Sequence, residues 1–276
     1  MEAPDQSPAP APAPPGIDPH LVSLLEPGTL EAEPYRALRH LVERRRQLTG
    51  GGVLVVTSPG MGDGKTTTAI NLAGALAQDP KARVLLIEAD LRSPTLDARL
   101  GLHGPGRRGL VDAILDPQIT LEAVVEPCPP FNLSVLCASR HRGGFYELLT
   151  SPRFADLIEE ARRRYDYVLI DSPPVVPFPD GRIVGSSVDG YLLVVSAGRT
   201  PRKLVQEALS LLDPAKLVGL VFNGEERSVT QGYYPSHMLT ALTPGSNGHA
   251  GRSWFAALLP RRRARRNRVR DGELWS

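Results

Sequence analysis

A glycine-rich loop between residues 57 and 68 contains the residue types that bind phosphate groups. It reads Thr-Ser-Pro-Gly-Met-Gly-Asp-Gly-Lys-Thr-Thr-Thr. Glycines let successive backbone N–H groups point inward, and a helix that begins at the end of the loop adds partial positive charge. Lys65 is expected to reach the outer phosphates of a nucleotide, and the Thr66 hydroxyl to coordinate Mg²⁺. The predicted nucleotide contacts are Gly60, Met61, Gly62, Asp63, Gly64, Lys65, Thr66 and Thr67.

Three carboxylates follow short apolar runs elsewhere in the chain. Glu88 and Asp90 come after the run at 84–87, and Asp171 comes after the run at 167–170. In open α/β sheets, the oxygen ligands of a nucleotide-bound Mg²⁺ come from the carboxyl ends of neighbouring strands. All three carboxylates could therefore converge on one metal, although each by itself is equally typical of a turn or a helix cap. The predicted metal ligands are Thr66, Asp90 and Asp171, and the predicted catalytic residues are Lys65, Glu88, Asp90 and Asp171.

Continuous apolar runs of strand length predict a parallel sheet. Runs without polar alternation are typical of strands that helices cover on both faces. The pattern indicates an α/β fold, a three-layer arrangement around a mostly parallel sheet in a single domain. The predicted strands are Val53–Thr57, Arg83–Glu88, Leu133–Cys137, Tyr167–Asp171, Tyr191–Ser196 and Leu217–Phe222.

Helical spacing of apolar residues occurs between these runs, over 69–76 and 154–161. Each pattern gives a helix one apolar stripe to pack on the sheet. Two helix starts are predicted at Ser151-Pro152 and Thr200-Pro201, where a hydroxyl can cap the helix and proline occupies its first position.

Composition divides the chain into four parts. Residues 1–16 are rich in Pro and Ala and are expected to be disordered. We expect a helical segment at 17–49, the nucleotide-binding domain at 50–225 and a flexible basic tail at 226–276. The net charge is +2, but eight arginines against two acids after residue 250 leave the rest of the chain acidic.

Several classes of protein are not indicated by this sequence. No apolar run approaches the roughly 18 residues of a membrane span, and no secretory leader is recognised at the N-terminus. The two cysteines, Cys128 and Cys137, form no metal-ligand pattern and suggest ordinary thiols in a reducing compartment.

The three motifs, in this order and spacing, resemble those of the bacterial tyrosine kinases, the P-loop family of capsule and exopolysaccharide export systems. Residues 57–68 resemble the family's Walker A motif, 84–94 its second acidic motif and 167–174 its Walker B motif. The segment 33–39 resembles its E-x-x-R-x-x-R element, and 188–195 and 217–223 resemble its late strands. The resemblance covers about residues 30 to 225. Asn223 matches the position that reads adenine in related ATPases.

This resemblance implies transfer of the ATP γ-phosphate to tyrosines in the C-terminal tails of neighbouring subunits, with Mg²⁺ as cofactor. It also implies that Glu33, Arg36 and Arg39 assemble subunits into a ring, and that a membrane polysaccharide co-polymerase activates the protein. From the residues alone, the same three side chains could equally form a solvated helix face. The implied location is cytoplasmic, at the inner face of the cell membrane.

The sequence departs from the family pattern at three places. Pro59 stands where a strict Walker A motif has glycine, and Glu88 stands where the family has Asp. After Asn223 only Tyr233 and Tyr234 are available as phospho-acceptors, whereas the family's tail is rich in tyrosine. These two residues are either a reduced acceptor site or merely loop aromatics.

Rival interpretations remain open at this stage. A positioning ATPase of the MinD/ParA group shares the loop, but it carries a second lysine where this chain has Gly60. The presence of Glu88 in place of Asp, together with only two tyrosines after Asn223, suggests a third interpretation. In it the protein is a nucleotide-gated scaffold that binds ATP and switches a partner but transfers little or no phosphate. The apolar stretch 254–259 and the arginines at 261–266 fit an anionic membrane surface, or a solubilising tail; no fold for specific nucleic-acid reading accompanies them.

Overall fold

A single sheet organises the part of the chain that the structure, a computed structural model, describes: residues 16–102, 104, 106–139 and 141–224. Its strands lie in the order β3-β4-β2-β5-β1-β6-β7. Each neighbouring pair is parallel except β3 with β4. The strands are β1 (Val53–Thr57), β2 (Val84–Glu88), β3 (Glu126–Pro127), β4 (Ser134–Leu136), β5 (Tyr167–Asp171), β6 (Gly190–Ser196) and β7 (Leu217–Asn223).

The predicted α/β class with its mostly parallel sheet is confirmed, and the six predicted strands lie within one residue of their expected ends. Strands β1, β2, β5 and β6 are buried along their whole length, which explains their continuous apolar sequences. Strand β3 was not predicted. It has two residues, one of them proline, and such a strand is tolerated at a sheet edge but gives no recognisable pattern.

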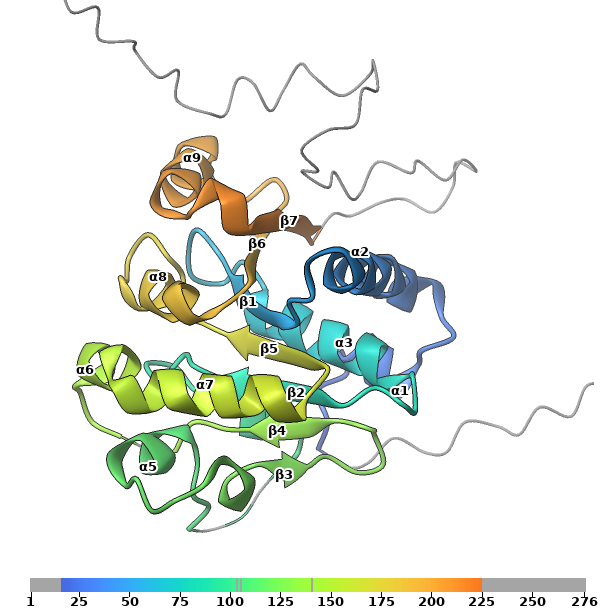
Figure 1. Cartoon of the computed structure of the whole chain (residues 1–276). Helices are drawn as coiled ribbons and strands as arrows, with labels where there is room; N and C mark the ends of the chain where they lie inside the picture. Colours follow the sequence, from blue (N-terminus) through green and yellow to red (C-terminus); the bar gives the residue numbers. More distant parts are fainter. Residues whose placement is uncertain (1–15, 103, 105, 140, 225–276) are drawn as a thin grey trace, which may run out of the picture.

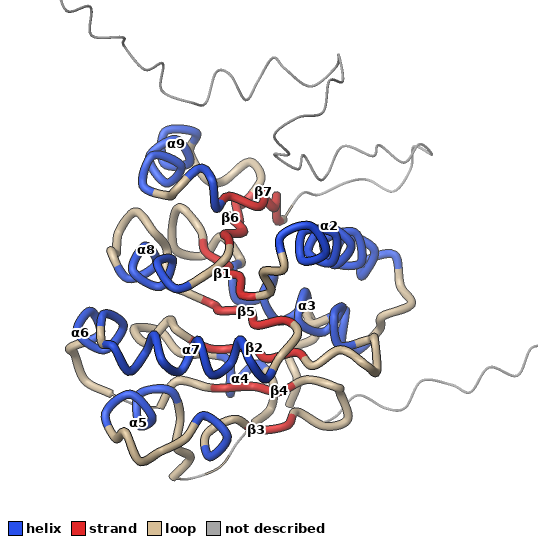
Figure 2. The backbone as a smooth tube through the Cα atoms, in the orientation of Figure 1, coloured by secondary structure: helices blue, strands red, loops and turns tan. Residues whose placement is uncertain are grey.

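Helices cover both faces of the sheet (Figure 1). One apolar core packs α1, α2, α3 and α4 against one face, and the other packs α5 to α9 against the opposite face. Figure 2 shows the strands passing between these two helical layers. The helices are α1 (Val22–Leu25), α2 (Glu33–Thr49), α3 (Lys65–Ala77), α4 (Leu96–Arg99), α5 (Leu110–Leu115), α6 (Phe145–Thr150), α7 (Pro152–Arg164), α8 (Asp180–Val184) and α9 (Arg202–Leu211).

The two predicted helix starts have different outcomes. The hydroxyl of Ser151 accepts a hydrogen bond from the Phe154 N–H and caps α7, as expected. The prediction for Thr200 was wrong, because α9 begins at Arg202 and the Thr200 hydroxyl donates instead to Asp63 in the glycine-rich loop. A side chain expected to cap a helix therefore supports the loop.

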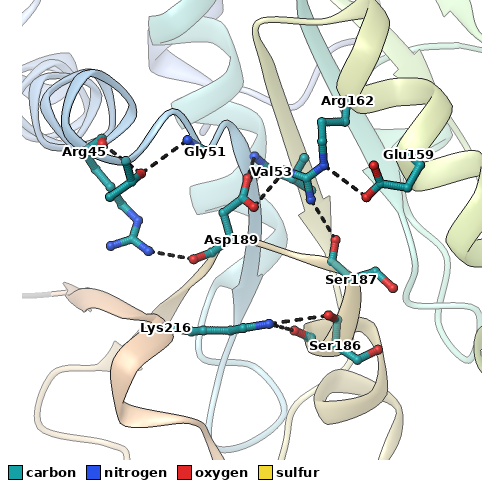
Figure 3. Close-up of polar contacts among 11 residues, drawn as sticks. Arg45, Gly51, Val53, Glu159, Arg162, Ser186, Ser187, Asp189 and Lys216 are labelled. Atoms are coloured by element: carbon teal, nitrogen blue, oxygen red, sulfur yellow. Dashed lines mark hydrogen bonds and ion pairs between the residues drawn. The ribbon is translucent and has the colours of Figure 1, made fainter.

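A polar cluster fixes the amino end of β1 (Figure 3). The Asp189 carboxylate accepts from the Val53 N–H at 2.9 Å and pairs with Arg162 of α7 at 2.6 Å. Arg45 of α2 donates to the Asp189 carbonyl at 2.6 Å. This cluster joins both helical layers to the amino end of β1. It therefore fixes the position of the strand whose carboxyl end leads into the glycine-rich loop.

Candidate active site

The glycine-rich loop joins the carboxyl end of β1 to the first residue of α3. Gly62 and Gly64 have φ values of +78° and +89°, in the left-handed region that favours glycine. A Cβ on Gly64 would lie 1.9 Å from Nδ2 of Asn223, whereas nothing lies within 4 Å of one on Gly62. Gly64 is therefore required both by its backbone conformation and by the close approach of Asn223.

Asp63 holds the loop in shape. Its Oδ1 accepts from the Thr200 hydroxyl at 2.6 Å, and its Oδ2 accepts from the Gly60 N–H at 2.9 Å. Its carbonyl accepts from Nδ2 of Asn223 at 3.1 Å. Two predicted nucleotide contacts thus form hydrogen bonds with Asp63: Gly60, which lies in the same loop, and Asn223, at the end of β7. Thr200 belongs to this arrangement and was missed as a site residue because nothing in its local sequence reveals a partner 137 residues away.

Lys65, Thr66, Asp90 and Asp171, four of the predicted site residues, meet at the start of α3. Nζ of Lys65 lies 2.7 Å from Oδ2 of Asp90. The Thr66 hydroxyl donates to Oδ2 of Asp171 at 2.7 Å. The thirteen-residue helix α3 directs its N-terminal partial positive charge at the same place. These groups can bind the phosphates of a nucleotide together with a cation.

Burial and neighbouring charges change the pKa values of Asp171 and Lys65 in this cluster. Burial raises the pKa of Asp171 to about 6, while the positive charges of Lys65 and, more weakly, Arg99 oppose that rise. Burial acts to lower the pKa of Lys65, but Asp171 and Asp90 outweigh it and the pKa lies above its ordinary value. Near neutral pH the site therefore holds an ammonium and an ionised Asp171.

A divalent cation fits the groups around Asp171. Its Oδ1 is buried and has no hydrogen-bond partner among the described residues. A carboxylate oxygen with no donor is suited to a metal ligand, and Mg²⁺ commonly takes one or two carboxylates with water and phosphate oxygens. Thr66, Asp171 and the neighbouring Asp90 are the groups that would hold it.

The expectation that three carboxylates converge on one metal is corrected by the structure. No group of three His, Cys, Asp or Glu side chains within the described ranges has the geometry to hold a metal ion. Glu88 pairs in register with Asp171, but three backbone N–H groups occupy its carboxylate. Thr95 and Leu96 donate to Oε1 at 2.6 and 2.7 Å, and Ala138 donates to Oε2 at 3.0 Å.

These contacts make Glu88 a clamp between the start of α4 and the end of β4. Its side chain is 1% exposed. Burial raises its pKa to about 7, against the three amide hydrogen bonds, which lower it. The extra methylene relative to aspartate is what brings the carboxylate to these amides.

We expect Glu88→Asp to lower the stability of the nucleotide-free protein by about 2–3 kcal/mol, because the carboxylate retreats by roughly one C–C bond and leaves buried amides unpaired. Thermal unfolding should show a Tm lower by roughly 5–10 °C. The matched control is Glu122→Asp, the same change at a surface ion pair with Arg164, which should alter the Tm very little. An unchanged Tm together with faster phosphoryl transfer would instead identify Glu88 as a catalytic base.

Arg92 fixes the loop that carries Asp90. Its Nε lies 2.6 Å from Oδ2 of the fully buried Asp180 at the start of α8. Its guanidinium stacks over the rings of Phe178 and Phe145, at 4.5 and 5.3 Å from their centroids. Arg92 is not among the predicted site residues, although its position two residues after Asp90 was the available signal.

The predicted oligomer contacts Glu33, Arg36 and Arg39 lie on α2. They differ in the contacts that they make with other parts of the same chain. Glu33 and Arg36 pair with each other at 2.5 Å. Arg39 pairs with Glu43 at 2.6 Å and donates to the Ala75 carbonyl of α3 at 2.9 Å. Arg39 therefore already joins α2 to α3.

Other predictions fall beyond what the structure describes. Tyr233, Tyr234 and the basic segment after residue 250 lie outside the described residues. Within the described part, no helix combines the length and the apolar character needed to cross a bilayer.

The chain is similar to known proteins over most of its length. The AAA domain family AAA_31 matches residues 53–184. Tyrosine-protein kinase YwqD of Bacillus subtilis (strain 168) is 35% identical over 222 residues, which cover 78% of this chain and 91% of YwqD.

Similarity extends to longer proteins and to solved structures. Succinoglycan biosynthesis transport protein ExoP of Rhizobium meliloti (strain 1021) is 33% identical over 202 residues, and the match covers 71% of this chain but only 25% of ExoP. The kinase domain of Escherichia coli tyrosine kinase ETK matches with a TM-score of 0.69 at 27% identity, covering 77% of this chain and 84% of that domain.

Proposed function

Because the chain belongs to the bacterial tyrosine kinase family of P-loop proteins, we propose that it transfers the γ-phosphate of ATP to tyrosine hydroxyls in capsule or exopolysaccharide biosynthesis. The observation that carries this proposal is the meeting of the Lys65 ammonium with the Thr66–Asp171 pair at the start of α3. A cation, a hydroxyl and a carboxylate with one free oxygen are what a phosphate chain and its metal require.

The chemistry follows from these groups. The tyrosine oxygen bonds to the γ-phosphorus as the bond to the β–γ bridging oxygen breaks, and ADP leaves. Lys65 stabilises negative charge on the transferring phosphate, and it must exchange its contact with Asp90 to do so. Asp90 is the carboxylate that would take the phenolic proton, since amides occupy Glu88. Thr66 and Asp171, with the neighbouring Asp90, would hold Mg²⁺, which would supply the positive charge that neutralises the phosphate oxygens.

The proposal extends to partners and location by family membership. We infer that subunits assemble into a homo-oligomer, closed as a ring, through α2. The exposed Glu33–Arg36 pair supports α2 as a contact, and Arg39 would contribute less because α3 already engages it. A membrane polysaccharide co-polymerase is the proposed activator. The protein would then act in the cytoplasm, at the inner face of the membrane, with Tyr233 and Tyr234 as candidate acceptors.

Incubation of the full chain with γ-labelled ATP, Mg²⁺ and its membrane partner tests the proposed reaction. We expect label on tyrosine, and Asp171→Asn should reduce it at least about 100-fold because the metal loses its buried carboxylate. A Tyr233→Phe, Tyr234→Phe double variant should lose most self-labelling. Full labelling of that variant would show that the acceptors lie elsewhere.

A nucleotide-gated ATPase without efficient transfer is the second candidate. The observation that favours it is the engagement of Glu88, which removes one potential base from the site. Release of inorganic phosphate without label on any tyrosine would support this candidate and contradict the kinase.

A further inference from the structure

A cavity of about 580 Å³ opens beside the first turn of α3. This volume is typical of sites that bind small organic ligands. One wall comes from α3 and the end of β7, and another comes from the segment that precedes α1. The residues that matter for its chemistry are Asp18, Glu31, Tyr35, Thr67, Arg99 and Asn223.

The position of the cavity relates it to the phosphate loop. Thr67 lies two residues after Lys65 in α3, and Asn223 lies directly over Gly64. The outer phosphates belong beside Lys65 and Thr66, so a nucleotide chain that continues past Thr67 brings its innermost phosphate and its sugar to this cavity. This step rests on the proposed function, which places a nucleotide on the loop.

Arg99 places a positive charge in the cavity, beside Thr67. Its Nη1 lies 3.1 Å from the Thr67 hydroxyl oxygen and 2.9 Å from Oδ2 of Asp18. About one third of its side chain is exposed, so the guanidinium has donors left for a ligand. An arginine fork binds phosphate oxygens with two parallel hydrogen bonds.

The segment before α1 holds Arg99 in position. The Asp18 N–H donates to the Arg99 carbonyl at 2.9 Å, and Ile17 forms a bridge with Leu100. The buried Asn71 of α3 then fastens the segment, since its Nδ2 donates to the His20 carbonyl at 2.9 Å. These contacts already attach the segment before α1 to α4 and α3. The Asp18–Arg99 ion pair is therefore not needed to hold that segment in place.

We propose that this cavity is the subsite for the sugar and α-phosphate of the nucleotide, and that Arg99 is the cation that binds the α-phosphate. In the absence of nucleotide, Asp18 is the counter-ion of Arg99. The α-phosphate takes over that contact, and Asp18 then only repels the ligand. The ligand class is a nucleoside 5′-diphosphate or triphosphate.

Calorimetric titration of the full chain with MgADP tests this assignment. We expect Arg99→Ala to weaken MgADP binding about 10- to 100-fold, the loss of one charge-assisted contact. Asp18→Asn should tighten binding about threefold or more, because it removes a competing negative charge and frees the guanidinium. If the ion pair were only structural, both variants would weaken binding to the same degree, and that result would overturn the proposal.

Two further outcomes keep the subsite separate from the proposed function. A wild-type chain that binds MgADP while Arg99→Ala binds within twofold of it overturns the subsite alone. A wild-type chain that binds no MgADP overturns the proposed function as well. Thermal unfolding of each variant accompanies the titrations. If Arg99→Ala does not fold, Arg99→Lys replaces it, with weaker binding expected because lysine lacks the planar fork.

Discussion

Lys65→Met should reduce phosphoryl transfer by about 100- to 1,000-fold, the cost of removing one positioned charge from a developing phosphate. Methionine has an unbranched side chain of similar length without the charge, so packing around the methylene groups of residue 65 changes little. The initial rate of label transfer to tyrosine, at saturating ATP and Mg²⁺, measures the effect. A rate within tenfold of wild type would contradict the role of Lys65.

The same substitution should also alter stability in a pH-dependent way. Burial raises the pKa of Asp171 to about 6, well above the value of 3.8 in an unfolded chain, and Lys65 moderates that rise. The folded state therefore holds its proton more tightly than the unfolded state, so stability falls as pH rises through this range. Without Lys65 the pKa rises further and the loss continues to higher pH. The substitution should therefore lower the free energy of unfolding more at pH 8 than at pH 5. We expect the two losses to differ by about 3 kcal/mol.

Lys216→Met is the matched control. Lys216 lies near Asp189 and Ser186 (Figure 3) and donates to the carbonyls of Gly185 and Ser186. It precedes the amino end of β7, whereas the glycine-rich loop follows the carboxyl end of β1, and these strands run parallel. Its replacement should leave label transfer unchanged, and its effect on the Tm should be similar at both pH values. A pH-independent effect of Lys65→Met would show that the pKa of Asp171 does not depend on the Lys65 ammonium.

Gly64→Ala should weaken ATP binding at least about 30-fold, which corresponds to about 2 kcal/mol. Alanine at φ +89° costs about 1–2 kcal/mol in backbone strain. The added methyl group would also lie 1.9 Å from Nδ2 of Asn223. The loop or the Asn223 side chain has to move, and either movement disturbs the amides that bind phosphate. Fluorescence titration with a labelled ATP analogue measures the loss.

Gly62→Ala separates strain from collision. Gly62 has nearly the same φ, but its Cβ would meet open space, so the expected loss of affinity is smaller, about tenfold. Adding Asn223→Ala to Gly64→Ala removes the collision and should recover part of the affinity, giving a non-additive double-mutant cycle. Strict additivity would show that Asn223 does not restrict residue 64.

Much of the fold was predictable because its signals are local. Continuous apolar runs such as Val53–Thr57 identify strands buried on both faces, and helical spacing over 154–161 identifies α7. The phosphate loop was predictable for the same reason, since its glycines, Lys65 and Thr66 are consecutive. Asp171 follows from its place at the end of a strand that neighbours β1.

Other features depend on partners far away in the chain and left no local signal. The Thr200 hydroxyl bonds to Asp63 across 137 residues, although Thr200-Pro201 has the form of a helix start. Arg99 and Asp18 are separated by 81 residues, and neither stands in a motif.

The amino-acid sequence by itself determined the strand–loop–helix that binds phosphate, because strand burial, glycine conformations and the helix terminus are properties of consecutive residues. Only the tertiary structure decided which groups surround Glu88. Its residue type and its place at a strand end fit a metal ligand, but amides at positions 95, 96 and 138 surround its carboxylate in the folded chain. The physical reason is that long-range packing sets which donors reach a buried carboxylate.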